Sequence, residues 1–125
     1  AFALLVDLVK SAAESLMLVD GYVDVNTLNI LSKKKEGVAV GLVTLPSARL
    51  TTPDVQVFES QYGPLSIVRT ADFHDRFLVI DRKAVYHIGA SLKDAGKKTF
   101  AVVLIDDDEI VQNLLDRIDD LVKKR

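Results

Sequence analysis

The stretch FHDRFLVIDRKAVYHIGAS, residues 73–91, contains two strand-like apolar runs that are joined by only two residues. The first run is RFLVID, residues 76–81, and the second is AVYHIGA, residues 84–90. The connecting Arg82-Lys83 is short enough for a hairpin. This stretch therefore predicts an antiparallel pair of strands late in the chain.

The rest of the chain alternates between helical and strand-like patterns. Nearly continuous apolar runs predict four more buried strands, over residues 16–22, 38–44, 65–70 and 100–105. Apolar residues at helical spacing predict helices over residues 2–15, 25–35 and 107–124. Pro53 favours a short helix over 53–63, and we expect Asn26 to cap the helix at 25–35, with Gly37 as its stop. The order predicts one α/β domain, a mixed and mostly parallel sheet flanked by helices.

Composition limits the classes of protein to which the chain can belong. The 125 residues are 49% hydrophobic and 27% charged, which suits a single folded domain with a sizeable core. A net charge of -2 gives no general attraction to nucleic acid or anionic membranes, so any anion site must be local. The chain has no cysteine and no apolar run long enough to cross a membrane, and we expect a cytoplasmic protein without membrane partners. Because it starts with Ala1 and not Met, we also expect a fragment of a longer protein.

His74 and Arg76 are the first candidate site residues. On a regular strand, side chains alternate between the two faces, so His74 and Arg76 converge on one face while Asp81 falls on the other. His87 lies inside the second apolar run, where a hydrogen-bonded core or sheet-edge histidine is the more common use. Tyr22 and Phe73 could stack on a nucleobase, although core packing is the more common use of such residues.

The segment HDRFLVID, residues 74–81, resembles the signature of the phospholipase D superfamily, which is His-x-Lys followed by four residues and Asp. His74 and Asp81 match the histidine and the aspartate, and Arg76 stands in the place of the lysine. The later HIGAS resembles the Gly-Ser segment of the family through Gly89 and Ser91. The resemblance implies that nearly the whole chain forms one half-unit of the phospholipase D fold.

The resemblance also implies a mechanism without metal or cofactor. In the family, one histidine attacks phosphorus to give a phosphohistidine, and a second histidine protonates the leaving group. His74 would take one of these roles, Arg76 would hold the phosphate oxygens, and Ser91 would donate a hydrogen bond. Asp81 would be a structural or orienting carboxylate. Because the chain has a single motif, the second histidine implies a homodimer.

The chain departs from the family pattern at several positions. Ala90 separates Gly89 from Ser91, and Lys93 stands near the place of a missing asparagine. The acid that often pairs with the histidine has no match. Asp20 is a substitute candidate, since it follows the first strand and parallel strands deliver side chains to a site at their carboxyl ends. We therefore add Asp20, Gly89 and Lys93 as candidate substrate-binding residues.

Two functions of different kinds follow from these residues. The first is a metal-independent phosphodiesterase, a nuclease acting on DNA or RNA. The second is a degenerate domain that binds nucleic acid phosphate or mediates dimerisation without cleaving. Family resemblance alone suggests a third, a dimerising regulatory domain within a defence or mobile-element protein.

Overall fold

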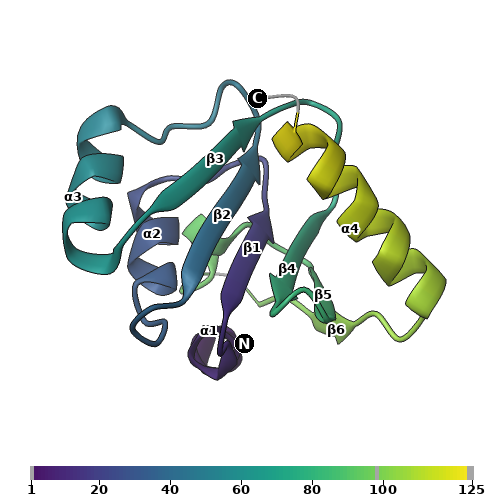
Figure 1. Ribbon diagram of the computed structural model, residues 1–125. Helices are drawn as coiled ribbons and strands as arrows, with labels where there is room; N and C mark the ends of the chain where they lie inside the picture. Colours follow the sequence, from purple (N-terminus) through teal and green to yellow (C-terminus); the bar gives the residue numbers. More distant parts are fainter. Residues whose placement is uncertain (1, 98, 124–125) are drawn as a thin grey trace.

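A computed structural model describes residues 2–97 and 99–123 as a six-stranded sheet with helices on both faces (Figure 1). The strands are β1 (Ser15–Val19), β2 (Ala39–Thr44), β3 (Leu65–Arg69), β4 (Arg76–Ile80), β5 (Ala84–Ile88) and β6 (Val102–Leu104). The helices are α1 (Phe2–Ser11), α2 (Val25–Leu31), α3 (Thr52–Tyr62) and α4 (Asp108–Lys123), with a short 3₁₀ turn, η1, at Leu92–Asp94. The predicted α/β class is confirmed.

The sheet has the strand order β3-β2-β1-β4-β5-β6. β1, β2 and β3 are parallel to one another, whereas β4, β5 and β6 each run antiparallel to the preceding strand in this order. It follows that β1, β2, β3 and β5 point in one direction, and that the predicted hairpin is β4–β5. The last strand is shorter than predicted, because only residues 102–104 pair with β5.

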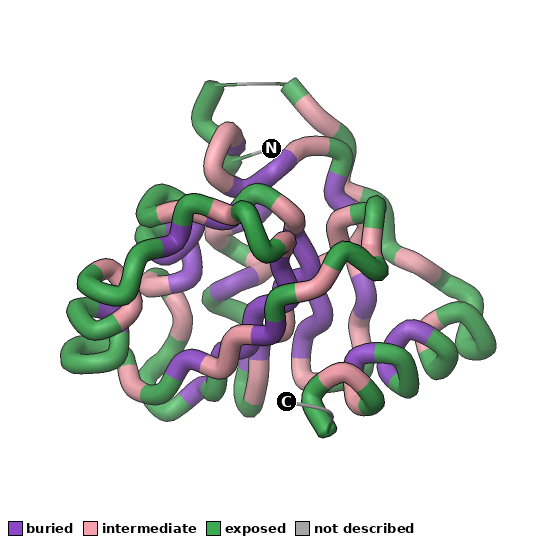
Figure 2. The backbone as a smooth tube through the Cα atoms, turned by 90° about the horizontal axis from the view of Figure 1, so that it is seen from above, coloured by how far each residue is buried: buried purple, intermediate pink, exposed green. Residues whose placement is uncertain are grey.

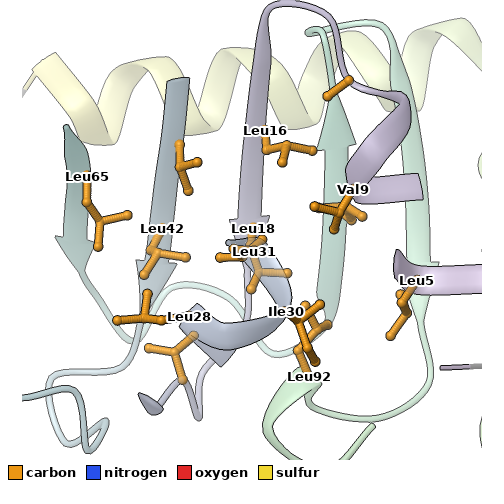
Figure 3. Close-up of a cluster of buried hydrophobic side chains, with 14 of the residues drawn as sticks. Leu5, Val9, Leu16, Leu18, Leu28, Ile30, Leu31, Leu42, Leu65 and Leu92 are labelled. Carbon is orange, nitrogen blue, oxygen red and sulfur yellow. The ribbon is translucent and has the colours of Figure 1, made fainter. Parts of the chain in front are cut away.

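Alternating side chains divide the core between the two faces of the sheet. Leu16, Leu18, Leu42 and Leu78 face α1, α2 and α3, and all four are buried (Figure 3). On the other face, Val19, Val43 and Val79 pack against Leu114, Leu115 and Ile118 of α4. Figure 2 shows the result, with buried positions gathered along the central strands and exposed positions on the outer sides of the helices. Burial on both faces explains why the central strands read as continuous apolar runs.

Helices α1 and α2 both end earlier than the sequence predicts, and α1 ends at Ser11 rather than at residue 15. The cap of α2 is Asp24 and not Asn26: the Asp24 carboxylate accepts hydrogen bonds from the backbone N–H groups of Asn26 and Thr27. The Thr27 hydroxyl accepts from the N–H of Asp24 in return, which completes a capping box. The helix then ends at Leu31, well before Gly37. The prediction of Pro53 in the first turn of a helix is confirmed in α3.

The last helix begins after a run of aspartates, as the helix dipole favours. The Asp107 carboxylate accepts from the N–H groups of Glu109 and Ile110, at 3.0 and 3.1 Å. The helix is described to Lys123, and Lys124, to which the prediction extended, lies outside the described residues. None of the helices described here combines the length and the apolarity that crossing a membrane requires.

Candidate functional site

One end of the sheet collects several of the predicted site residues. Asp20 directly follows β1, and β4 runs antiparallel to β1, so that Arg76 at its start lies at the same end. The next strand, β5, reverses again and delivers Gly89 and Ser91 there. Topology thus brings together three segments that are more than ten residues apart in sequence.

A buried hydrogen-bond network joins Asp20 to Ser91. The Ser91 hydroxyl lies 2.9 Å from both oxygens of the Asp20 carboxylate, to which it donates. The same carboxylate accepts from the backbone N–H of Leu92 at 2.9 Å and of Tyr22 at 3.0 Å. Asp20 is 0% exposed, so it has no surface with which to contact a substrate. Asp20 therefore stabilises the site by holding the segments of Tyr22 and Ser91 together. We expected Asp20 to contact the substrate directly, and its burial does not allow this contact.

Ser91 is also buried, and its single hydroxyl proton is directed at Asp20 rather than at the surface. This differs from the expected donation to phosphate. Leu92, which follows it, is anchored in the core among α1 and α2 (Figure 3). The segment after β5 is thereby fixed on both sides of Ser91.

Arg76 is half-buried and binds main-chain carbonyl groups of β5 and the residue after it. Its Nε donates to the oxygen of Ile88 at 3.3 Å, and its Nη2 donates to the oxygen of Gly89 at 3.1 Å. Nη1 makes no hydrogen bond with any residue in 2–97 or 99–123. The guanidinium is therefore held in place through Nε and Nη2, and the N–H groups of Nη1 can still donate to a ligand.

A surface hollow of about 390 Å³ lies beside this guanidinium, and we name it the Arg76 hollow. Its walls include Tyr22, Arg76, Gly89, Ser91 and Lys93, together with the acidic residue Asp94. Gly89 packs closely there: a Cβ at this position would lie 3.2 Å from the oxygen of Ala101, a tight contact that favours glycine. Four of the predicted site residues thus line one hollow.

Lys93 supplies a second cation to the Arg76 hollow. Its Nζ lies 2.8 Å from the Asp94 carboxylate, and this hydrogen bond raises the pKa of Lys93 above its usual range. The nearby carboxylates of Asp24 and Asp20 add to the shift. The ammonium therefore stays charged throughout the physiological pH range.

His74 is exposed and lies in the loop just before β4, two residues ahead of Arg76. It is at the same end of the sheet as the Arg76 hollow but is not among the residues that line it. The imidazole makes no hydrogen bond or ion pair within the described part of the chain. A substrate could therefore reach both of its nitrogens.

The loop that carries His74 is held by α4, which sequence reasoning missed. Arg117 donates to the backbone oxygen of Asp72 at 3.1 Å, and its guanidinium carbon lies 4.5 Å from the centre of the Phe73 ring. Phe73 also packs against the apolar cluster under α4. Phe73 is therefore a packing residue, and no sequence pattern links it to Arg117, which is 44 positions away.

His87 lies on the β5 face that is covered by α4, away from the Arg76 hollow. Its ring stands edge-on to Phe77, with centroids 5.6 Å apart, and its Nε2 is 3.6 Å from an Asp75 oxygen. This is the structural use that we expected for a histidine within a strand.

The structure separates Asp81 from all the other site candidates. Asp81 follows β4 at the opposite end of the sheet, where its Oδ1 accepts from the N–H groups of Ala13, Glu14 and Ser15 at 2.7–3.1 Å. Asp81 and Arg82 have φ angles of 55° and 57° and form the hairpin turn. Short polar side chains tolerate this left-handed conformation best. Asp81 thus connects the hairpin to the start of β1 through hydrogen bonds. This is the structural role that the resemblance implied for the aspartate of the motif.

We expect Asp81→Asn to destabilise the protein at neutral pH, by a difference that shrinks progressively as the pH falls below ~4. Backbone N–H groups, that of Ser15 foremost, lower the pKa of Asp81. A depressed pKa contributes stability that is present above the unfolded-state pKa and is lost as pH falls through the folded-state pKa. Urea unfolding of both proteins at pH 7 and pH 3 measures the effect. An equal stability difference at both pH values would contradict it.

No group of three or more His, Asp or Glu side chains in the described ranges could hold a metal ion. In the acidic run at the start of α4, the Asp107 carboxylate accepts hydrogen bonds from backbone N–H groups of the helix.

No protein-family model and no curated protein matches the sequence. Solved structures do match. Nuc from Salmonella typhimurium, a phospholipase D family member, has 17% identity, covers 95% of this chain and 84% of its own, and gives a TM-score of 0.67. NucT from Helicobacter pylori has 15% identity, with coverage of 97% of this chain and 86% of its own, and a TM-score of 0.66.

A third similar structure is TrmBL2, an archaeal chromatin protein with a described novel mode of DNA binding. It has 16% identity and a TM-score of 0.59, and the match covers 98% of this chain and 48% of TrmBL2. At such identities the similarity concerns the fold. The fold that residues 74–91 predicted by resemblance is thereby confirmed, and the chain has the fold of the phospholipase D family.

Proposed function

We propose that the protein is a metal-independent phosphodiesterase that cleaves nucleic acid through a phosphohistidine. The observation that carries the proposal is the convergence of Arg76, Lys93 and the Asp20–Ser91 pair at the sheet end where His74 emerges. An exposed imidazole at the same end of the sheet as Arg76 and the Asp94-paired Lys93 suits a phosphodiester, whose attack by a nucleophile builds negative charge on the phosphoryl oxygens. TrmBL2, which shares the fold, is a DNA-binding protein.

In this proposal, one imidazole nitrogen of His74 attacks phosphorus and the ester oxygen leaves. Arg76 donates to a non-bridging oxygen through Nη1, while its other donors stay on the β5 carbonyl groups. Lys93 neutralises a second oxygen. Ser91 and Asp20 do not touch the substrate, and they fix the segment that carries Lys93. Water then cleaves the phosphorus–nitrogen bond and regenerates the imidazole.

The leaving oxygen needs a proton, and the other histidine, His87, lies on the α4 face of β5 beside Asp75, away from the Arg76 hollow. We propose that His74 of a second copy supplies the proton and later accepts one from water. Such a dimer would have a two-fold axis near the Arg76 hollow. The cytoplasmic location and the longer parent protein, both expected from the sequence, stay predictions.

The alternative is a domain that binds phosphate without cleaving, and one observation favours it. The Nε and Nη2 atoms of Arg76 are bonded to the carbonyl oxygens of Ile88 and Gly89, so the guanidinium is fixed to β5 and is less able to follow the phosphoryl group as it is transferred. A lysine would bring a single mobile ammonium to the same place.

Substitution of Arg76 separates the two functions. We expect Arg76→Ala to weaken oligonucleotide binding about 10-fold or more, because one charge-assisted contact contributes about 1.5–3 kcal/mol. Arg76→Lys should retain both binding and cleavage if the protein is an enzyme. Affinity and turnover are measured for the wild type and both variants in excess chelator, with Arg82→Ala at the other end of the sheet as the matched control.

The outcomes decide between the functions. Turnover by the wild type in chelator supports the enzyme, and a requirement for a divalent ion would refute the metal-independent mechanism. Binding that depends on Arg76 without any turnover would favour the binding domain. Affinity that does not respond to Arg76→Ala would remove the phosphate site and both functions with it.

A further inference from the structure

Two hollows on the surface share a boundary at Tyr22. The first is the Arg76 hollow. The second, of about 310 Å³, is lined by Tyr22, Asp24, Ser47, Ala48, Arg49 and Lys93, and we name it the Arg49 hollow. Tyr22 and Lys93 line both hollows. A chain of ligand groups that occupies one hollow can therefore continue into the other past the tyrosine ring.

Tyr22 is an exposed aromatic residue on a fixed backbone. Its side chain is not used in the core, since 55% of the residue is exposed. Its N–H donates to the buried Asp20 carboxylate at 3.0 Å, and Gly21 before it packs so closely that a Cβ would lie 3.1 Å from Leu45. The turn is therefore held by the same network that braces Ser91. A rigidly placed, solvent-facing ring is suited to stacking on a flat ligand.

Arg49 is a cation on a loop that, like the turn of Tyr22, is held by hydrogen bonds to its backbone. Its side chain is exposed and makes no hydrogen bond or ion pair with the residues that the structure describes. The loop that carries it is fastened by the Arg69 guanidinium, which donates at 3.1–3.3 Å to four carbonyl groups, those of Leu45, Pro46, Ala48 and Leu50. Preorganised backbone with a free guanidinium suits a phosphate group.

We propose that Tyr22 and Arg49 form a nucleotide subsite for single-stranded nucleic acid, adjoining the phosphate site of the Arg76 hollow. The ring of Tyr22 stacks on an unpaired base, and Arg49 binds the neighbouring phosphate. The strand must be single because the bases of a duplex are stacked on both faces and cannot reach a side-chain ring. The inference rests on the proposed function, because it places the subsite beside the scissile phosphate.

The test uses binding of a labelled single-stranded oligonucleotide and of an abasic oligonucleotide of equal length. We expect Tyr22→Ala to weaken binding of the normal oligonucleotide about 10-fold, since stacking contributes ~1–3 kcal/mol per base. Tyr22→Phe keeps the ring and should bind as the wild type does. Tyr62→Ala removes another tyrosine, 39% exposed on α3, and should change nothing. On the abasic strand, wild type and Tyr22→Ala should bind equally.

Arg49→Ala should weaken binding of both oligonucleotides, and it should reduce the slope of log affinity against log salt by about one. Equal losses for Tyr22→Ala on normal and abasic strands, or no loss on either, would overturn the stacking subsite. Arg76→Ala separates that failure from a failure of the proposed function. If Arg76→Ala weakens binding while Tyr22→Ala does not, only the subsite is wrong. If the wild type binds neither oligonucleotide, both are wrong.

Discussion

His74→Asn should abolish phosphodiester cleavage, with a loss of at least ~10³-fold in turnover, because removing a nucleophile removes the reaction path. The fold should be unaffected. His74 is exposed and bonds to no other described residue, so its replacement should change the free energy of unfolding by less than about 0.5 kcal/mol. Turnover of an oligonucleotide and urea unfolding of the same samples measure the two quantities.

The chain provides a matched control in its only other histidine. His87 lies on the face of β5 that is covered by α4 and is in contact with Phe77. His87→Asn should therefore leave turnover within about twofold, because the His87 ring is turned away from the Arg76 hollow. Equal turnover of His74→Asn and wild type would rule out His74 as the nucleophile. An equal loss in both histidine variants would point to general destabilisation.

Asp20→Ala should cause the largest loss of stability of the substitutions considered, about 3 kcal/mol. The substitution leaves the Leu92 N–H and the Ser91 hydroxyl buried without their acceptor, and the partly buried N–H of Tyr22 also loses it. A buried donor without a partner costs ~1–3 kcal/mol, and two are created here. For a chain of this size, the midpoint of thermal unfolding should fall by about 10 °C.

The exposed Asp7 on α1 is the control for Asp20, because Asp7→Ala removes an aspartate that is not buried. Its unfolding free energy should stay within about 0.5 kcal/mol of the wild type. If Asp20→Ala were as stable as Asp7→Ala, the buried network would not be the brace that the structure indicates. Asp20→Ala should also weaken oligonucleotide binding at temperatures where the variant is folded, because the segment carrying Lys93 is released.

Patterns that repeat along the chain predicted the fold well. The runs at 76–81 and 84–90 identified the β4–β5 hairpin, since strands buried on both faces are continuously apolar. The position of Asp20 at the site end of the sheet could be predicted because it follows a parallel strand, whereas its burial and its bond to Ser91 could not. Order along the chain also explains why Arg76, Gly89 and Ser91 meet, because each strand reversal returns the chain to the same end of the sheet.

Contacts of side chains with main-chain groups far away in the sequence could not be predicted, because they produce no repeating pattern in the sequence. Arg69 fastens a loop about 20 positions earlier, and Arg117 holds the loop before His74 from 45 positions away. Arg76 was expected to bind a phosphate, yet its bonds to β5 carbonyl groups depend on how closely two strands approach. The Asp24 cap was missed because Asn26 is as good a capping residue, and only the backbone path decides between them.

The most direct test of the account is the mass of the protein during turnover. Wild-type protein is mixed with an oligonucleotide in chelator, quenched within the first turnover under alkaline denaturing conditions, and digested for peptide mass measurement. The account predicts a phosphoryl-linked nucleotide adduct on the peptide that carries His74, which His74→Asn lacks and His87→Asn retains. Cleavage with no adduct at His74, or with an adduct on another residue, would contradict the proposed mechanism.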